Sequence, residues 1–267
     1  MRIGVIGLGS IGKRHVANLL ELGHEVMGFD ERITTEAWTA KGIGLLYNWK
    51  PEAVVICTPP ASHAALAIEA MHHGCHCFIE KPIVHRGLES ATVLAVAKSK
   101  GLHLAVGYQL RWQLDSVGFH ADKDIVWECS QNMAEWPSQY QKDVLGEFSH
   151  EIDAAVFVNG PVEKLTARES VYGWVIQMRH LSCVSTILIN PRATSYSRTA
   201  SIGSQDIWTF STDENDLAYK RELQAFLNVC QGQPWDERLC SGAEATHTVR
   251  IIEACRESMR ECKVMAL

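Results

Sequence analysis

The sequence predicts two domains, an α/β domain built on a doubly wound parallel sheet and then an α+β domain built on a largely antiparallel open sheet. In the first ~110 residues, short β-branched runs alternate with helical stretches, which is typical of a sheet covered by helices. After Gly107, strand-like runs follow one another with one helix between the first two, which favours an antiparallel or mixed sheet. The length of 267 residues accommodates two domains but not three.

The first domain, over residues 1–111, is predicted from runs of apolar residues that end at turn residues or lead into helices. Its predicted strands are Arg2–Ile6, Glu25–Phe29, Ala53–Cys57, His76–Ile79 and His103–Val106. Its predicted helices are Gly12–Leu22, Ala61–His73 and Gly87–Lys100. The connection between the second and third strands is short for such a sheet, so we expect a trimmed region after Asp30.

The second domain, over residues 112–267, begins where the alternation of strands and helices stops. Its predicted strands are Ile125–Cys129, Lys164–Ser170, Gly173–Arg179, Ser182–Asn190, Ala200–Gly203 and Asp206–Phe210. Its predicted helices are Glu147–Val158, Asp216–Val229 and Gly242–Glu261. The first of these helices ends at an Asn-Gly-Pro sequence, which is a stop signal.

Composition excludes several classes of protein. The chain is 46% hydrophobic and 21% charged, as expected for a folded globular protein. It has no apolar run near the ~20 residues of a membrane helix and no secretory signal pattern, so we expect a cytoplasmic protein. The net charge of −6 without a basic stripe argues against a nucleic acid or an anionic membrane as partner.

The nine cysteines are odd in number and lie in apolar stretches, so we interpret them as reduced thiols. The segment from His72 to Cys77 contains five residues that can bind metals. However, a helix ending at Gly74 followed by a buried strand would point these side chains in different directions. We therefore predict no metal site.

A glycine pattern, Gly7, Gly9 and Gly12, follows the first strand and opens the first helix. Glycines at this spacing permit a tight turn, a close approach of the backbone to a pyrophosphate, and close packing of helix on strand. The backbone of Ser10 and Ile11 at the helix N-terminus would then bind the phosphates. This context predicts a dinucleotide-binding domain of the Rossmann type.

Asp30 ends the second strand, 18 residues after Gly12. A carboxylate in this place binds the ribose hydroxyls of NAD and repels the 2′-phosphate of NADP. The neighbouring Arg32 could accommodate that phosphate, so NADP remains an alternative to the NAD that we predict.

Glu80, Lys81 and Pro82 follow the predicted strand that ends at Ile79. Ligands of parallel sheets bind at the carboxyl ends of the strands. A partly desolvated lysine near a nicotinamide cation can exchange a proton with a substrate hydroxyl. The alternative is a solvated surface lysine.

Several motifs together resemble the Gfo/Idh/MocA family of NAD(P)-dependent oxidoreductases, named after glucose-fructose oxidoreductase and inositol dehydrogenase. They are GLGSIGKRH at 7–15, CTPPASH at 57–63, HCFIEKP at 76–82, VGYQLRW at 106–112, GEFSHEIDAAVFVNGPV at 146–162 and AYKRELQAFLNVCQGQP at 218–234. The resemblance spans nearly the whole chain and is strongest to bacterial members that act on sugars or amino sugars.

The resemblance implies that Lys81 and His150 are catalytic. Asp153 is three residues after His150 on a predicted helix, so the two share a face, and we include it among the catalytic candidates. Many family members carry an aspartate three or four residues before this histidine. This chain has Gly146 and Glu147 there, and Glu147 is the best substitute.

The resemblance also places cofactor and substrate contacts. Beside the glycine loop, the expected cofactor-binding residues are Thr58, Pro59, His63, Glu80 and Lys81. The expected substrate-binding residues are Tyr108, Gln109, Arg111 and Trp136. Arg111 could instead tie the domains together, Trp136 could belong to a core or an interface, and His63 could be a helix N-terminal residue without a ligand.

The predicted function is hydride transfer between a nicotinamide cofactor and a secondary alcohol or ketone of a sugar, amino sugar or polyol, with Lys81 and His150 handling the proton. One alternative is a non-catalytic NAD-binding regulator, because a fold does not fix a function. Another is a glycoside hydrolase that uses NAD transiently. By resemblance, the open sheet of the second domain would pair subunits in a homodimer or homotetramer.

Overall fold

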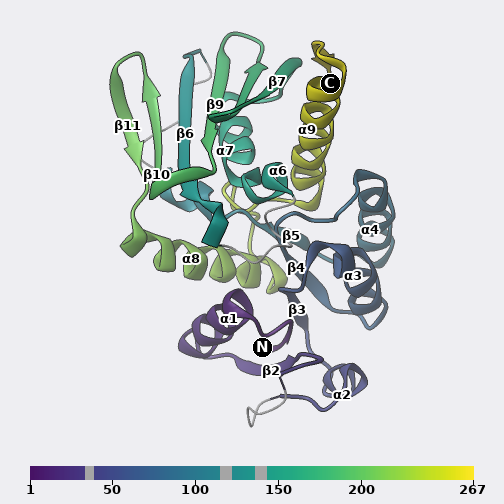
Figure 1. Ribbon diagram of the computed structural model, residues 1–267. Helices are drawn as coiled ribbons and strands as arrows, with labels where there is room; N and C mark the ends of the chain where they lie inside the picture. The colour runs from purple at the N-terminus through teal and green to yellow at the C-terminus, as the bar shows by residue number, and fades with distance from the viewer. Residues whose placement is uncertain (34–38, 115–121, 136–142) are drawn as a thin grey trace. The chain divides into compact units, whose positions relative to one another are not determined.

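The computed structural model describes residues 1–33, 39–114, 122–135 and 143–267 (Figure 1). The chain forms two compact units, each taken by itself below. Unit 1 comprises Met1–Gln109 and Asp216–Thr246, and unit 2 comprises Leu110–Asn215 and His247–Leu267. Unit 1 therefore includes a segment from late in the sequence. The predicted functional division at residue 111 stays a prediction.

Unit 1 contains a five-stranded, wholly parallel sheet in the order β2-β1-β3-β4-β5. Its strands are β1 (Arg2–Ile6), β2 (Glu25–Phe29), β3 (Ala53–Ile56), β4 (His76–Glu80) and β5 (Leu104–Gly107). Its first helices are α1 (Ser10–Glu21), α2 (Ile43–Asn48), α3 (His63–His72) and α4 (Gly87–Lys100). Because the strand order reverses at β1, the carboxyl ends of β1 and β3 border the crevice where such sheets bind ligands.

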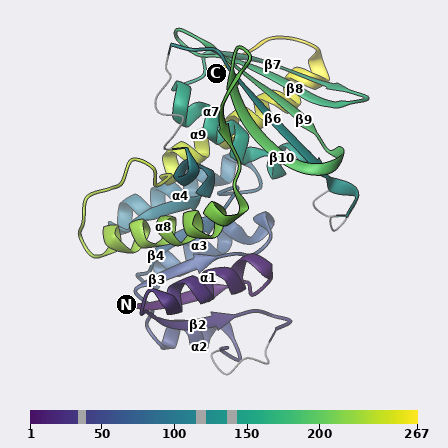
Figure 2. The same cartoon turned by 90° about the vertical axis from the view of Figure 1, so that its left-hand side faces the viewer.

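Helices cover both faces of this sheet. Right-handed crossovers place α1 on one face and α3 with α4 on the other, as Figures 1 and 2 show. The face shared with α1 is completed by α8 (Thr212–Cys230). There Phe226 packs against Phe78 of β4 with ring centroids 5.6 Å apart, and Tyr219 meets His15 of α1 edge-on at 5.7 Å. The late helix thus supplies cover that the N-terminal segment lacks.

Unit 2 contains a seven-stranded sheet in the order β11-β10-β6-β9-β8-β7-β12. Its strands are β6 (Ile125–Asn132), β7 (Lys164–Ser170), β8 (Gly173–Arg179), β9 (Val184–Asn190), β10 (Arg192–Ile202), β11 (Gln205–Thr209) and β12 (Met265–Ala266). Among the described strands of this second sheet, only β6 and β9 pair in parallel; the other pairs are antiparallel. The predicted fold class is therefore confirmed.

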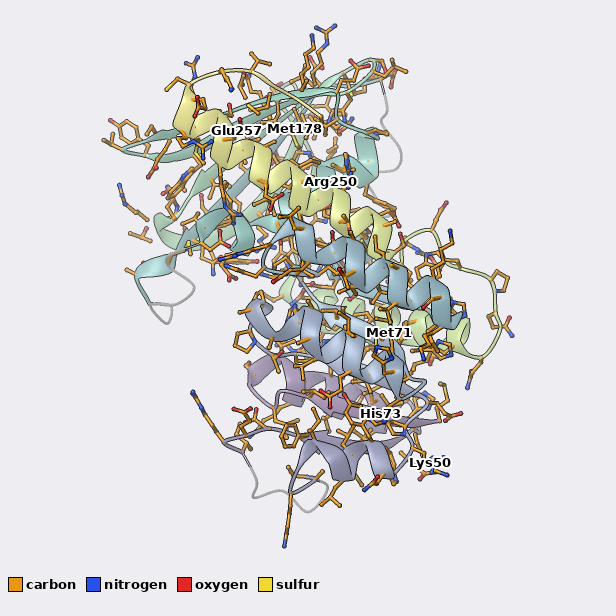
Figure 3. The ribbon with its side chains drawn as sticks, turned by 90° about the vertical axis from the view of Figure 1, so that its right-hand side faces the viewer. Lys50, Met71, His73, Met178, Arg250 and Glu257 are labelled. Carbon is orange, nitrogen blue, oxygen red and sulfur yellow. The ribbon has the colours of Figure 1, made fainter. Side chains whose placement is uncertain are left out.

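Helices α6 (Val144–Glu147), α7 (Ser149–Asn159) and α9 (Gly242–Glu261) accompany the second sheet. Their apolar residues form one core with the inward-facing residues of the strands, among them Trp127, Ile152, Ile187 and Ile251. In Figure 3, Met178 marks the buried side of β8, while Arg250 marks the exposed side of α9. Alternation along the strands leaves Glu128, Val175 and Leu188 on the other face of the sheet.

Two predicted elements differ from the structure, and one helix lies where none was predicted. The predicted helix Glu147–Val158 is two helices, α6 and α7, which are separated at Phe148. The predicted strand Ala200–Gly203 is only the end of β10, because the first half of that strand is polar and gives no periodic apolar signal. The short helix α2 lies in the region predicted to be trimmed.

Candidate active site

The glycine loop between β1 and α1 has the shape that its spacing predicts. Gly7 has a φ of +90°, and a Cβ there would come within 2.8 Å of the Cys57 carbonyl carbon. A Cβ on Gly12 would overlap the backbone oxygen of Gly7, whereas a Cβ on Gly9 would meet nothing within 4 Å. Gly7 and Gly12 are thus required for packing, whereas the space that a Cβ on Gly9 would occupy is open.

The N-terminus of α1 lies directly after this loop. Gly9 is the N-cap residue and no side chain caps the helix, so the first N–H groups, which include those of Ser10 and Ile11, are not used by a capping side chain. An α-helix carries partial positive charge at this end, so its N-terminus attracts phosphate groups. The loop and the helix N-terminus therefore have the geometry expected of a phosphate-binding site.

Asp30 follows β2 and is fixed by the backbone around it. Its Oδ2 accepts a hydrogen bond from Leu8 N at 2.8 Å, and its Oδ1 accepts from Arg32 N at 2.8 Å and Ile33 N at 3.1 Å. Partial burial raises the pKa of Asp30, but these hydrogen bonds and the charge of Arg32 outweigh it and lower the pKa overall. Asp30 is therefore an ionised carboxylate beside the glycine loop.

Glu80, at the end of β4, forms a buried pair with His15 of α1. The distance from His15 Nε2 to Glu80 Oε1 is 2.7 Å. The other carboxylate oxygen, Oε2, accepts a hydrogen bond from the backbone N–H of Lys81 at 3.3 Å. Burial and the charge of Glu80 raise the pKa of the nearby Cys57 thiol. Glu80 thus connects the helix of the glycine loop to Lys81, a link that the sequence did not predict.

His63 lies at the start of α3 and is fully buried. Its Nδ1 is 2.8 Å from the backbone oxygen of Pro82, and its Nε2 is 2.6 Å from that of Thr58. The pKa of His63 is lowered overall, because burial lowers it more than the two carbonyl oxygens and the charge of Glu80 raise it. Both ring nitrogens face backbone oxygens, which favours a role in holding the loops after β3 and β4 over direct contact with a cofactor.

The loop after β3 holds two more of the predicted cofactor contacts. Thr58 Oγ1 accepts a hydrogen bond from Ser62 Oγ at 2.8 Å. Pro59 precedes a short 3₁₀ helix, Pro60–Ser62. Both therefore lie at the carboxyl edge of the sheet, where the fold predicts the ligand.

Two predicted substrate contacts follow β5 in unit 1. The backbone N–H of Tyr108 donates to Glu222 Oε1 of α8 at 2.7 Å, and both residues are buried. Gln109 is also buried, and its Oε1 accepts no hydrogen bond from the described residues. Since a buried acceptor without a partner is costly, Gln109 stays a candidate for a ligand contact.

In unit 2, Arg111 and Asp153 form a bidentate ion pair. Arg111 Nε is 2.7 Å from Asp153 Oδ2, and Arg111 Nη2 is 2.8 Å from Oδ1. Both side chains are about 1% exposed, and the guanidinium lies 4.8 Å from the ring centroid of Phe157. This geometry favours a structural role for both residues over the substrate-binding and catalytic roles predicted for them.

His150 is buried near the start of α7. The next residue, Glu151, pairs with Arg198 of β10 at 3.0 Å, and both are buried. Because successive residues of a helix differ by about 100° in direction, Glu151 points away from the side of α7 that His150 and Asp153 share. Glu151 and Asp153 each pair with an arginine of unit 2. Viewed along the helix axis, the His150 side chain lies at an angle between these two ion pairs.

Glu147, the predicted substitute carboxylate, ends α6. That helix is capped by Asp143, whose carboxylate accepts from Gly146 N at 3.2 Å and pairs with Arg256 at 2.6 Å. A Cβ at Gly146 would overlap the Asp143 carboxylate, which accounts for a glycine at this position.

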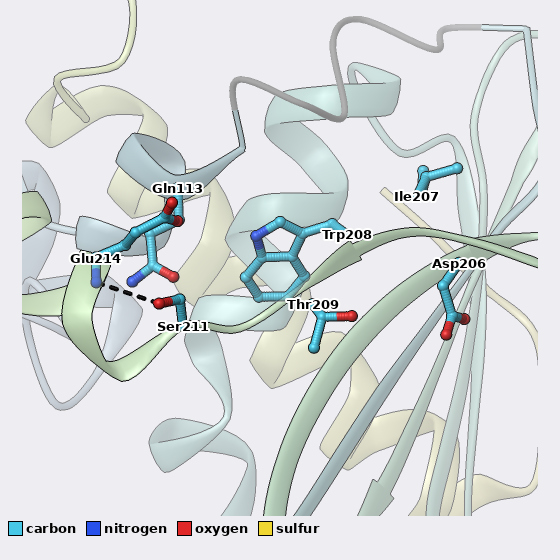
Figure 4. A pocket seen from close by; sticks show the side chains of 7 residues that line it. All are labelled: Gln113, Asp206, Ile207, Trp208, Thr209, Ser211 and Glu214. Carbon is cyan, nitrogen blue, oxygen red and sulfur yellow. Dashed lines mark hydrogen bonds between the residues drawn. The ribbon is translucent and has the colours of Figure 1, made fainter.

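A polar pocket of about 360 Å³ lies within unit 2 (Figure 4). It is lined by the end of the 3₁₀ helix Gln109–Gln113, by β11 and by the start of α8. The lining residues are Gln113, Asp206, Ile207, Trp208, Thr209, Ser211 and Glu214. No motif in the sequence indicated it.

Three further predictions concern single features. Trp136 lies outside the described residues. Within the described ranges, no group of three or more His, Cys, Asp or Glu side chains is arranged to hold a metal ion. Of the segment from His72 to Cys77, the Cys75 thiol faces the Pro51 carbonyl at 3.2 Å and the Cys77 thiol is buried. In the same part of the chain, none of the helices combines the length and the apolar character needed to cross a bilayer.

Comparison with known proteins gives a family model that matches the first 108 residues, and solved structures with the same fold. Residues 1–108 match the family model GFO_IDH_MocA, described as an oxidoreductase family with an NAD-binding Rossmann fold. The chain is 29% identical to UDP-N-acetylglucosamine 3-dehydrogenase of Acidithiobacillus ferrooxidans over 60% of its own length and 55% of that relative. It is 28% identical to scyllo-inositol 2-dehydrogenase (NAD(+)) of Bacillus subtilis over 42% of its length and 36% of that relative. The matches thus span about half or less of these relatives.

Solved structures share the fold of the whole chain. A probable dehydrogenase from Thermotoga maritima has a TM-score of 0.85 at 20% identity, covering 100% of this chain and 98% of that one. The structure of the Acidithiobacillus ferrooxidans dehydrogenase has a TM-score of 0.82 at 21% identity, covering 98% of both chains. At these identities the likeness concerns the fold alone.

Proposed function

We propose that this chain, whose residues 1–108 belong to the Gfo/Idh/MocA family of NAD-binding oxidoreductases, is an NAD-dependent dehydrogenase. The observation that carries the proposal is the edge of the first sheet. There an open glycine loop and an uncapped helix N-terminus lie beside the ionised Asp30, and Glu80 links the same helix to Lys81.

The residues of unit 1 fit a dinucleotide. The open space at Gly9 and the N-terminus of α1 suit a pyrophosphate, and Asp30 suits the two ribose hydroxyls of an adenosine. Bound NAD would supply the hydride acceptor. Asp30 also repels a 2′-phosphate, and this charge supports NAD over NADP.

We assign the transfer of the substrate hydroxyl proton to Lys81 and His150. Lys81 follows β4 in unit 1, and His150 begins α7 in unit 2. An imidazole with a pKa near neutrality suits proton transfer. A lysine beside a cationic cofactor ring is more readily deprotonated. Glu147 is kept as the third candidate, whereas Arg111 and Asp153 are assigned to holding α7 in place.

The proposed substrate carries a secondary alcohol on a sugar, amino sugar or polyol. This class is taken from relatives whose names specify an amino sugar nucleotide and an inositol. Gln109 and Tyr108 of unit 1 remain candidates for binding it. The nine free cysteines support a reducing compartment such as the cytoplasm.

We also propose that residues 112–267 assemble subunits through the outer face of the second sheet. The residues Val175 and Leu188 on this face, together with polar neighbours, give the mixed apolar and polar character of protein interfaces. The pairing produces a homodimer or a homotetramer.

The test of the catalytic assignment is Lys81→Ala. Removing a general acid–base group lowers turnover by about 10²–10⁴-fold, whereas NAD affinity should stay within about twofold because other residues hold the pyrophosphate. Turnover is followed by NADH absorbance with sugars, amino sugars and inositols, and NAD affinity by calorimetry.

The matched control is Lys98→Ala, an exposed lysine on α4, which should leave both quantities unchanged. Lys81→Ala with normal turnover would remove Lys81 from the mechanism. A wild-type chain that binds NAD but oxidises none of these compounds would contradict the dehydrogenase function.

A further inference from the structure

We propose that Glu222 of α8 is a positioning residue for the dehydrogenase reaction, because it holds the end of β5 against the strand that leads to Lys81. The proposal rests on the dehydrogenase function and adds to it a residue that acts through the backbone rather than on the substrate. It is argued from contacts within unit 1. Glu222 lies 114 positions after the backbone group that it contacts.

The place of Glu222 in α8 is an apolar one. Its side chain is 0% exposed, and one turn before and after it Tyr219 meets His15 and Phe226 packs against Phe78. Residues three and four positions apart share a helix face, so Glu222 belongs to the face that covers the parallel sheet. A buried carboxylate is costly unless it accepts hydrogen bonds. Since an apolar side chain would cover the sheet at lower cost, the carboxylate indicates a polar task.

This task is to fix the turn at the end of β5. Glu222 Oε1 accepts a hydrogen bond from the backbone N–H of Tyr108 at 2.7 Å. The same N–H also donates to the backbone oxygen of Val106 at 3.0 Å, so the chain turns tightly at Gly107. The N–H would therefore keep an acceptor without Glu222. Because a hydrogen bond to a carboxylate is shorter and stronger than a neutral one, Glu222 restrains the direction of the turn rather than only satisfying a donor.

Gly107 connects this turn to the neighbouring strand. It pairs with Glu80 in the parallel register of β4 and β5. A Cβ at Gly107 would lie 3.2 Å from Cδ and from both oxygens of the Glu80 carboxylate, so this carboxylate lies directly against the glycine. Its Oε2 accepts the backbone N–H of Lys81 at 3.3 Å. A shift of the turn after β5 would therefore displace the carboxylate that holds Lys81.

A second route leads from α8 to the same carboxylate. Glu80 Oε1 is 2.7 Å from His15 Nε2, and the His15 ring meets Tyr219, which lies three residues before Glu222 on α8. The helix thus reaches Glu80 both through the imidazole of His15 and through the end of β5. Two contacts of one helix restrain the carboxylate, and with it the turn that contains Lys81, more closely than either contact alone.

The test replaces the carboxylate and keeps the helix. Glu222→Leu removes the acceptor but keeps apolar cover, so kcat should fall about 10- to 100-fold, as expected when a catalytic group is misplaced. NAD affinity, measured by calorimetry, should stay within about twofold because the glycine loop is unchanged. Glu222→Gln keeps an oxygen that can accept the Tyr108 N–H and should hold kcat within about threefold of the wild type.

The matched control is Leu223→Ala at the neighbouring buried position. It opens a cavity and lowers the melting temperature, but kcat should be unchanged at temperatures where the variant is folded. An unchanged kcat in Glu222→Leu, equal losses in Glu222→Leu and Glu222→Gln, or an equal loss in Leu223→Ala would overturn the proposal. If Glu222→Leu does not fold, Gly107→Ala decides, because it presses a methyl group against the Glu80 carboxylate; a normal kcat there would equally overturn the proposal.

Hydrogen exchange separates this proposal from the proposed function. Exchange of the Lys81 and Tyr108 amides, followed by NMR, should be at least tenfold faster in Glu222→Leu than in the wild type and unchanged in Glu222→Gln. If the wild type oxidises none of the compounds but exchange changes in this way, the dehydrogenase function fails and the positioning role of Glu222 stands. If the wild type is active and the exchange of Lys81 is unaltered in Glu222→Leu, the function stands and the proposal for Glu222 fails.

Discussion

The carboxylate of Glu80 joins two parts of the proposed NAD site. One carboxylate oxygen of Glu80 contacts His15 on α1, the helix that follows the glycine loop. The other accepts a hydrogen bond from the backbone N–H of Lys81. His15 is also packed edge-on against Phe78 and Tyr219. The pair therefore fixes the turn that contains Lys81 relative to the helix that we propose binds the phosphates.

Removing the imidazole of His15 tests this connection. His15→Phe keeps the ring contacts but removes the hydrogen bond to a buried carboxylate, which costs about 1.5–3 kcal/mol. We expect the melting temperature to fall by about 3–10 °C for a chain of this size, measured by calorimetry. We also expect a lower kcat, with a smaller change in the affinity for NAD.

The control is His72→Phe, which changes an exposed histidine on α3. A normal melting temperature and kcat in His15→Phe would show that the pair does not position Lys81. A fall in stability with an unchanged kcat would limit the pair to a structural role.

At the scale of elements, α7 is held on two sides within unit 2. Glu151 pairs with Arg198 of β10, and Asp153 pairs with Arg111. The axial rotation of α7 is thereby fixed, since the two contacts lie at different angles around the helix. The two ion pairs therefore also determine the direction in which the His150 side chain points.

Asp153→Asn separates a structural from a catalytic role. The change leaves the buried guanidinium of Arg111 without its counter-charge, and breaking a buried ion pair costs about 3–5 kcal/mol. The melting temperature should fall by about 6–15 °C, and the double variant Asp153→Leu with Arg111→Met should recover much of that loss. A stable Asp153→Asn variant that has lost turnover would instead support the catalytic role that the sequence indicated.

Local patterns explain which elements could be predicted. The strands of both sheets that carry apolar runs were predicted within a few residues, and the glycine loop was identified from its spacing and its place between a strand and a helix. The polar first half of β10 carries no such pattern, so it was missed. The family resemblance is confirmed for residues 1–108.

Contacts between distant residues explain what could not be predicted at the site. His15 and Glu80 are 65 positions apart, and Arg111 and Asp153 are 42 apart. Such pairs depend on strand order and helix placement, which no local period specifies. The sequence therefore indicated Arg111 and Asp153 as candidates but not that they form an ion pair with each other.

At the scale of the whole molecule, the outer face of the second sheet is the surface through which we propose that subunits assemble. Val175 is 38% exposed, and Leu188 lies beside it on β9. A hollow of about 280 Å³ on this face is lined by both, together with Glu128, Ser130, Ser170, Tyr172, Gly173, Trp174, Ile189 and Asn190. Aromatic residues beside aliphatic ones, with a polar surround, are typical of an interface.

The proposed assembly is tested by placing charge at the centre of this face. Val175→Asp with Leu188→Asp would bury two unpaired carboxylates in the interface, which is costly, so the variant should be a monomer where the wild type is a dimer or tetramer. Mass is measured by light scattering after size-exclusion chromatography. Leu88→Asp serves as the control, because this leucine is 90% exposed on α4 of unit 1 and its change should leave the mass unaltered. A monomeric wild type, or an unchanged oligomer in the double variant, would show that subunits do not meet through this face.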